Sequence, residues 1–174
     1  GGGGRVALVV TNADADFSSF TGSISAYGGG SGAGAGSVYQ RTAIQGLYEG
    51  TLIIDNNAMS GATEISSNVT DTDVGDVILR RGGDLVLMSN RTLTVGGSWS
   101  NGANFSAQPG SQVIFAGNAA STSSVYGSNM FMFLTCTNAG KTLQFQAGKT
   151  NAIADYGTLT LNGSSVSNLI LRST

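Results

Sequence analysis

Val77-Ile78-Leu79, Leu85-Val86-Leu87 and Leu93-Thr94-Val95 are three short apolar runs that follow one another closely and are separated by polar or glycine-containing segments. The series continues through Val113-Ile114-Phe115, Phe131-Met132-Phe133-Leu134, Leu143-Gln144-Phe145, Leu159-Thr160-Leu161 and Leu169-Ile170-Leu171. Such runs, recurring roughly every 8–14 residues, are typical of an all-β fold. Loose self-similarity at this spacing favours a solenoid, in which each coil stacks on the previous one.

The predicted fold is therefore a right-handed parallel β-helix, a β-solenoid whose coils each use two or three short strands. Coils of roughly 20–25 residues would make about seven coils from this chain. Inward Val, Leu, Ile and Phe side chains are expected to stack, and Asn side chains at the turns to form ladders. The alternative is an antiparallel β-sandwich, which relies on tight hairpins. Asn101-Gly102 and Asn162-Gly163 are the only Asn-Gly pairs, which favours the solenoid.

Composition separates the chain from several functional classes. Gly supplies 27 of 174 residues, and only 10% of the residues are charged. The net charge of −2, without a basic patch, argues against a nucleic-acid partner. No apolar run approaches the roughly 20 residues of a membrane helix, so membrane insertion is not expected. Neutral Asn, Ser and Thr supply the polarity instead, as in many secreted repeat proteins, which favours an extracellular or cell-surface location.

The chain is expected to form one solenoid domain over residues 1–174. Residues 1–42 are expected to form N-terminal coils, interrupted by a flexible glycine-rich loop over residues 28–36. Residues 43–81 would form middle coils, and residues 82–174 the most regular, C-terminal coils. No linker and no long helical pattern divides these segments.

Several segments resemble the repeat regions of large bacterial secreted and surface proteins of the adhesin and autotransporter-passenger type. The resemblance is carried by Gly1-Gly2-Gly3-Gly4-Arg5-Val6-Ala7-Leu8, Gly50-Thr51-Leu52-Ile53-Ile54-Asp55-Asn56, Leu93-Thr94-Val95-Gly96-Gly97-Ser98-Trp99-Ser100-Asn101 and Gly157-Thr158-Leu159-Thr160-Leu161. It implies a parallel β-helix with an extracellular, non-enzymatic role. Such proteins usually run much longer than this chain, so the chain is expected to be a processed unit or a fragment.

Catalytic chemistry has little basis in the sequence. Histidine is absent, so Ser-His and Cys-His nucleophile pairs are excluded. The chain is therefore expected not to be an enzyme and to need no cofactor. Asp71, Asp73 and Asp76 form the densest carboxylate group and are the candidate ligands for a structural Ca²⁺, although a solvated acidic turn is favoured. A carbohydrate-active β-helix enzyme, which would use such carboxylates, is the second alternative function.

A few other residues carry expectations of their own. Cys136 is the only cysteine and is expected to be a small buried side chain without reactivity. Trp99, Tyr126 and Tyr156 are expected to pack in the core or at coil edges rather than to stack on sugars. Sequons of the Asn-x-Ser/Thr type, which matter only in a glycosylating secretory pathway, begin at Asn68, Asn90, Asn104 and Asn162.

Both terminal segments read as strands without polar caps. Val6, Leu8 and Val10 at one end, and Leu169, Ile170 and Leu171 at the other, are the candidate assembly residues. An open solenoid end exposes unpaired backbone and apolar surface, and a head-to-tail contact between such ends builds a fibre. The expected function is a self-assembling subunit of an extracellular filament or surface layer, whose partner is itself. The first alternative is an adhesin stalk segment that binds surfaces or glycans.

Overall fold

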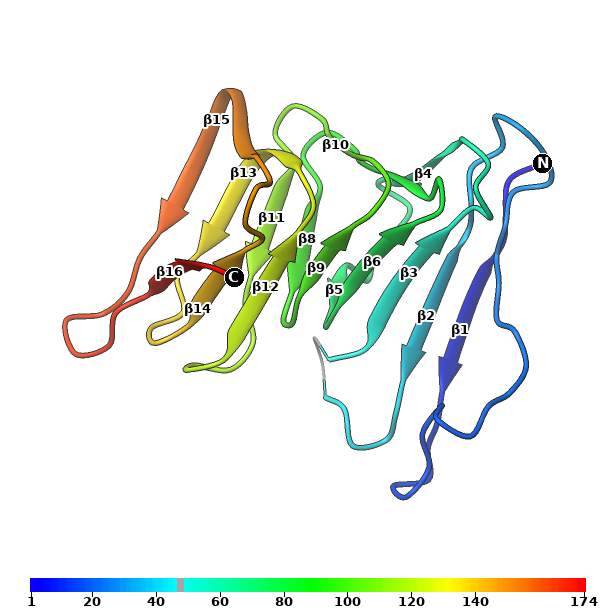
Figure 1. Ribbon diagram of the computed structural model, residues 1–174, viewed down its shortest axis with the longest axis horizontal. Coiled ribbons are helices and arrows are strands. Elements are labelled where there is room, and N and C mark those ends of the chain that lie inside the picture. The colour runs from blue at the N-terminus through cyan, green and yellow to red at the C-terminus, as the bar shows by residue number, and fades with distance from the viewer. Residues whose placement is uncertain (47–48) are drawn as a thin grey trace.

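The computed structural model describes residues 1–46 and 49–174, and in this part of the chain the regular elements are all β-strands. Figure 1 shows them arranged side by side around one long axis, with the N-terminal strands at one end and the C-terminal strands at the other. The protein is thus an all-β, parallel β-solenoid of about five turns.

Three sheets form the sides of the solenoid. Sheet A contains, in spatial order, β1 (Arg5–Val9), β2 (Ser37–Arg41), β3 (Thr51–Asp55), β6 (Val77–Arg80), β9 (Trp99–Asn101), β12 (Thr122–Tyr126), β14 (Thr142–Phe145) and β16 (Ile170–Ser173). Sheet B contains β4 (Ala62–Ile65), β7 (Asp84–Leu87) and β10 (Phe105–Ala107). Sheet C contains β5 (Asp73–Val74), β8 (Thr92–Val95), β11 (Gln112–Phe115), β13 (Asn129–Cys136) and β15 (Asn151–Leu161).

From β3 onward the chain visits the sheets in a fixed order. The first three coils each place one strand in sheets A, B and C. The next two coils use only two strands, because β13 and β15 are long; β13 also contacts β10 of sheet B. Each coil pairs in parallel with its neighbours, with Leu52 beside Val77 and Val77 beside Trp99 in sheet A. This is the arrangement that the spacing of the apolar runs predicts.

The coil count is smaller than the seven predicted, and the difference lies in the first fifty residues. There β1 and β2 extend sheet A without forming complete coils, and β2 runs antiparallel to β3. The pairing of Val38 with Ile53 and of Gln40 with Thr51 is that of a hairpin and not of a stacked coil. A division of the chain length by one coil length therefore overestimates the number of coils.

The core consists of inward side chains that stack from coil to coil. One row in sheet C runs through Val74, Val95, Phe115 and Cys136, all of which are buried. The aromatic rings of Trp99, Phe105 and Phe131 pack together inside the third and fourth coils, with ring centroids 4.8 to 5.8 Å apart. Burial of Trp99 and Cys136 confirms the expectation for both residues.

A ladder of asparagine side chains runs along one corner, as the turn composition predicts. Asn101 Nδ2 donates to Asn129 Oδ1 at 3.0 Å, and Asn129 Nδ2 donates to Asn151 Oδ1 at 2.8 Å. The buried Trp99 Nε1 donates to the same Asn129 oxygen at 2.8 Å. The ladder therefore links three successive coils and satisfies a polar atom of the core.

The glycine-rich segment 28–36 is packed against the first coil rather than extended into solvent. Gly32 N donates to Ser60 O at 3.0 Å, and Thr63 Oγ1 donates to Ala35 O at 2.6 Å. A Cβ atom on Gly34 would overlap the carbonyl oxygen of Ala62. Glycine is needed here because two stretches of backbone approach more closely than a side chain allows.

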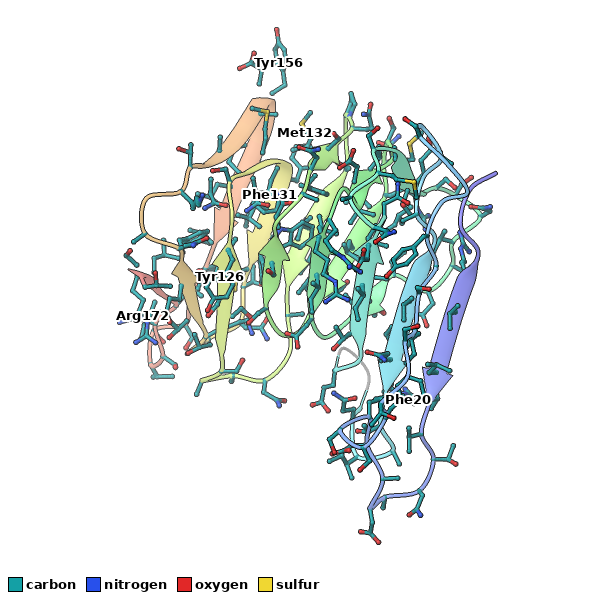
Figure 2. The ribbon with its side chains drawn as sticks, turned by 45° about the vertical axis from the view of Figure 1, so that its right-hand side comes forward. Phe20, Tyr126, Phe131, Met132, Tyr156 and Arg172 are labelled. Carbon is teal, nitrogen blue, oxygen red and sulfur yellow. The ribbon has the colours of Figure 1, made fainter. Side chains whose placement is uncertain are left out.

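Strand β15 contains a bulge that carries an exposed aromatic side chain. Phe131 pairs with Ile153 and Phe133 with Thr158, so four residues of β15 face one residue of β13. Tyr156 lies in this bulge with a φ of 63° and is 99% exposed. Figure 2 shows its ring projecting away from the body of the solenoid, which differs from the packed position expected for it.

Candidate functional site: the two open ends of the solenoid

The C-terminal end exposes apolar side chains that the preceding coils bury. Leu159 pairs with Leu134, and Leu171 pairs with Leu143. Leu134 and Leu143 are 3% and 0% exposed, whereas Leu159 and Leu171 are each 51% exposed. The difference arises because, among the described residues, β15 and β16 are the outermost strands of sheets C and A at this end and no strand of that part of the chain covers them.

The predicted assembly residues of this end lie at that surface. Ile170 is 49% exposed, and its backbone N–H donates to Lys141 O on one side of the strand. Leu169 is partly buried against the core. Arg172 donates from Nη2 to the neutral Oε1 of Gln144 at 2.9 Å and lies at the same end in Figure 2. Leu169, Ile170 and Leu171 therefore do come together at one end.

Two of the predicted residues of the opposite end, Val6 and Leu8, lie on β1, the outermost strand of sheet A at that end, and Val10 follows it directly. Val6, Leu8 and Val10 are half-buried, and within the described part of the chain β1 pairs only with β2. Val10 N donates to Arg41 O at 2.9 Å, which continues the pairing just beyond the strand. This end differs from the C-terminal one because β1 and β2 extend sheet A beyond the first coil, whereas sheet C ends at β5.

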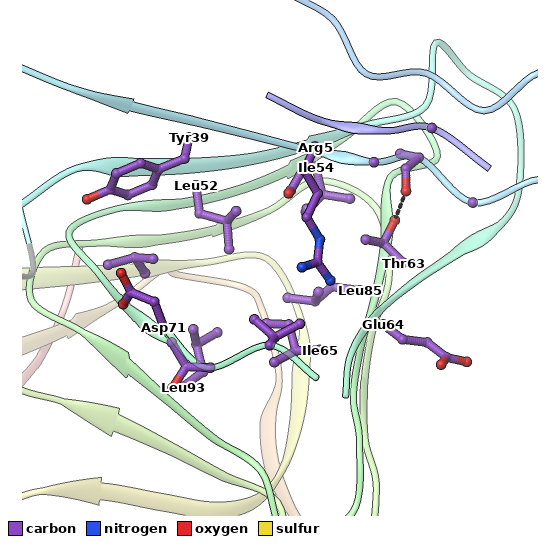
Figure 3. A pocket seen from close by; sticks show the side chains of 18 of the residues that line it. Arg5, Tyr39, Leu52, Ile54, Thr63, Glu64, Ile65, Asp71, Leu85 and Leu93 are labelled. Carbon is purple, nitrogen blue, oxygen red and sulfur yellow. Dashed lines mark hydrogen bonds between the residues drawn. The ribbon is translucent and has the colours of Figure 1, made fainter. Parts of the chain in front are cut away.

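A cavity of about 660 Å³ opens on the uncovered side of the first coil. Its wall includes the inner faces of β1, β2 and β3, the glycine-rich segment and the strands β4 and β5. The apolar lining consists mainly of Leu52, Ile54, Ile65, Val74, Leu85 and Leu93. Figure 3 shows the Arg5 side chain directed into this cavity between Ile54 and Leu85, with Asp71 on the opposite rim. The open side is that of sheet C, where β5 is the last strand.

Sheet B is covered at this end by the glycine-rich segment, and Asn56 holds that segment in place. The buried Asn56 side chain accepts from Gly28 N at 2.8 Å through Oδ1 and donates to Ala33 O at 2.9 Å through Nδ2. These two bonds tie the start and the interior of the glycine-rich segment to the first coil. No local sequence pattern predicts this role, because Asn56 is recognisable from the sequence only as a turn residue.

A charged cluster beside Asn56 fixes the same segment from outside. Asp55 forms ion pairs with Arg80 at 2.8 Å and Arg81 at 2.6 Å, and Arg81 Nη2 donates to Tyr27 Oη at 2.8 Å. Burial alone would raise the pKa of Asp55, but hydrogen bonds from Arg81, the Asn57 N–H and Arg80 together hold that pKa below its usual value. The carboxylate therefore stays ionised and links the N-terminal segment to two successive coils.

The three aspartates proposed as calcium ligands do not converge on one point. Asp71 and Asp73 line the cavity at the N-terminal end, whereas Asp76 lines a separate corner pocket of about 520 Å³. Asp76 Oδ1 accepts from Ser98 N at 2.7 Å. Among the described residues, no group of three or more His, Cys, Asp or Glu side chains is placed to hold a metal ion.

The core contains a charged residue for which the sequence offers no signal. Lys141 is fully buried, and its Nζ donates to Ser121 Oγ at 2.9 Å and to Gly96 O at 3.2 Å. Desolvation lowers the pKa of Lys141, and burial raises the pKa of Cys136. The amine links the corners of three successive coils, which is a structural role.

Comparisons with protein-family models, with curated proteins and with solved structures found no match. Within residues 1–46 and 49–174, no helix has the length and hydropathy needed to cross a bilayer.

Proposed function

We propose that this chain is a structural, self-assembling subunit that polymerises head to tail through its solenoid ends. The observation that carries the proposal is the exposure of Leu159 and Leu171, whose counterparts one coil earlier are buried. The side chains are placed as if another layer of β-structure covered them. A second copy of the chain supplies such a layer.

Sheet A provides the continuous element of this contact. It ends in β16 at one end of the solenoid and in β1 at the other. Pairing of β16 with β1 of the next copy extends the sheet from subunit to subunit by strand addition. Because β2 runs antiparallel to β3 and β1 is parallel to β2, the new pair is antiparallel when successive copies point the same way.

The energetic gain comes from the half-exposed apolar side chains at the joint. Complete burial of a Leu or Ile side chain contributes about 1.5–3 kcal/mol, so covering a half-exposed one contributes about 1 kcal/mol. Leu159, Ile170 and Leu171 together then contribute about 3 kcal/mol, to which Leu and Val side chains of the opposing end add. A head-to-tail contact of this kind does not close on itself and produces a filament.

The proposed setting is extracellular, in a filament or surface layer. Low charge, an abundance of Gly, Asn, Ser and Thr, and the resemblance to adhesin-type repeats support this setting. The lateral faces then remain free along the filament, and the function resides in length and surface.

Electron microscopy and sedimentation of the purified chain test the proposal. The wild-type chain is expected to form regular filaments, and Leu171→Lys is expected to leave monomers because it places a charge in the joint. Tyr156→Lys is the matched control, since Tyr156 is exposed on a lateral bulge, and it is expected to polymerise normally. A wild-type chain that stays monomeric at high concentration would overturn the proposal.

A further inference from the structure

The two Asn-Gly pairs of the chain have the same sequence but different surroundings. Asn101-Gly102 begins in the last residue of β9, within the stacked coils. Asn162-Gly163 directly follows β15 and opens the loop to β16 at the C-terminal end of the solenoid (Figure 1). In such a pair the glycine has no side chain to hinder attack of its backbone nitrogen on the asparagine side chain. The reactivity of each pair therefore depends on whether the fold holds these two groups apart.

The Asn101-Gly102 pair is held at each of the atoms that would react. Asn101 Nδ2 donates to Asn129 Oδ1 at 3.0 Å, and Asn101 Oδ1 accepts from Ala103 N at 3.1 Å. Gly102 N donates to Leu79 O at 2.8 Å. Attack of the glycine nitrogen on the side-chain amide would first break these bonds in a partly buried corner, which makes the pair unreactive while the chain is folded.

The Asn162-Gly163 pair is free at the same atoms. Within residues 1–46 and 49–174, the exposed Asn162 side chain makes no hydrogen bond, and Gly163 N has no acceptor. Only the backbone of Asn162 is fixed, because its N–H donates to Cys136 O at 3.0 Å. The bonds that shape the loop use Ser164 and Ser167 instead, with Ser164 N donating to Ser167 O at 2.9 Å. The Asn162 side chain is thus able to turn toward the nitrogen of Gly163.

The fold itself requires glycine at position 163. A Cβ atom on Gly163 would lie 2.6 Å from Leu169 N and 3.0 Å from Ser167 O, which is closer than a side chain allows. The returning arm of the loop thus demands the residue that also leaves Asn162 open to attack.

We infer that Asn162 is a site of self-modification, at which the free subunit converts a neutral amide into a carboxylate. Gly163 N bonds to Asn162 Cγ, and Nδ2 leaves as ammonia together with the proton of the glycine nitrogen, which closes a succinimide ring. Water then opens either ring carbonyl, so position 162 becomes an aspartyl or an isoaspartyl residue. Both products carry a negative charge, and water is the only co-reactant.

The consequence of this reaction rests on the proposed head-to-tail assembly. Asn162 shares a surface hollow of about 600 Å³ with the joint residues Leu169 and Leu171, and no Lys or Arg side chain of the described chain lines this hollow. A neighbour that covers the joint would therefore desolvate the new carboxylate without a cationic partner, which weakens the contact. An assembled joint also shields Asn162 from water, so free subunits lose their capacity to assemble with time and assembled ones keep it.

Peptide mapping by mass spectrometry tests the site. The folded chain, diluted until it is monomeric and incubated at mildly alkaline pH, is expected to convert at Asn162 and not at Asn101. In urea both positions are expected to convert at similar rates, because unfolding releases the groups that hold Asn101. Asn162→Gln is the control, since its longer side chain does not form the same ring. A folded chain in which Asn162 resists as well as Asn101, while both react in urea, overturns the inference.

Polymerisation assays separate this inference from the proposed function. Asn162→Asp, which carries the charge of the product, is expected to raise the critical concentration for filament formation roughly tenfold, whereas Asn162→Gln polymerises like the wild type. Unchanged circular dichroism and melting temperature verify that both variants fold. Conversion at Asn162 in a chain that never polymerises overturns head-to-tail assembly and leaves the modification site intact. Filaments whose free subunits keep Asn162 unmodified overturn the inference and leave head-to-tail assembly intact.

Discussion

Replacement of Asn129 by Ala provides the most direct test of the corner ladder. Asn129 Oδ1 accepts from Trp99 Nε1 at 2.8 Å, and Asn129 Nδ2 donates to Asn151 Oδ1 at 2.8 Å and to Gly127 O at 3.2 Å. The substitution leaves the buried Trp99 donor without a partner, which costs about 1–3 kcal/mol. Loss of the other bonds adds about 1 kcal/mol, because water can reach the half-exposed Asn151. The expected decrease in the free energy of unfolding is therefore about 2–4 kcal/mol.

Urea unfolding followed by tryptophan fluorescence measures this decrease, since Trp99 is the single tryptophan and is buried. Asn104→Ala is the control, because Asn104 is an exposed Asn at another turn, and its effect is expected to stay within about 0.5 kcal/mol. In a Trp99→Phe background, which removes the donor, Asn129→Ala is expected to cost less, as measured by circular dichroism. An equal cost in both backgrounds would refute the role assigned to the Trp99–Asn129 bond.

Three further changes test other parts of the structure. Burial lowers the pKa of Lys141 from its usual value of 10.5, so the unfolded chain binds more protons than the folded chain in the alkaline range. The stability of the wild type relative to Lys141→Met is therefore expected to increase as the pH rises toward 10.5. A difference between their urea midpoints that does not change with pH contradicts this expectation. Cys136 has a raised pKa and is fully buried, so iodoacetamide followed by mass spectrometry is expected to label it in urea and not in the native chain; equal labelling would place the thiol at the surface. Gly36→Ala is expected to lower the free energy of unfolding by about 1–3 kcal/mol, because the added Cβ atom would overlap the carbonyl oxygen of Gly4. Gly30→Ala is the control: a Cβ atom there meets no other atom within 4 Å, so the same urea assay is expected to show almost no change.

The regular part of the solenoid is visible in the sequence because each coil repeats a local pattern. The runs 77–79, 85–87 and 93–95 correspond to β6, β7 and β8, and alternate residues of each run face the core. The N-terminal part is different, because an alternating strand looks the same whether it stacks in parallel or closes a hairpin. The antiparallel pairing of β2 with β3 is decided by contacts between segments, which local periodicity does not contain.

The candidate site was predictable at one end and only partly at the other. The apolar run 169–171 indicates the C-terminal surface directly, since Ile170 and Leu171 are about half exposed there and Leu169 packs against the core beside them. The N-terminal cavity depends on which side of the first coil lacks a strand, and this follows from the tertiary arrangement of β1, β2 and β5. Proximity in sequence also misleads for Asp73 and Asp76, because the chain turns a corner between β5 and β6 and directs them to different pockets.

The bulge of β15 shows how this solenoid accommodates extra residues within a strand. Four residues of β15 are matched by one residue of β13, yet pairing resumes at Thr158 and continues to Leu161. An insertion at this place is thus absorbed locally, and the coils on either side keep their alignment. Tyr156 therefore marks the position where we expect a foreign peptide inserted into the chain to be displayed at the surface without disturbing the coils.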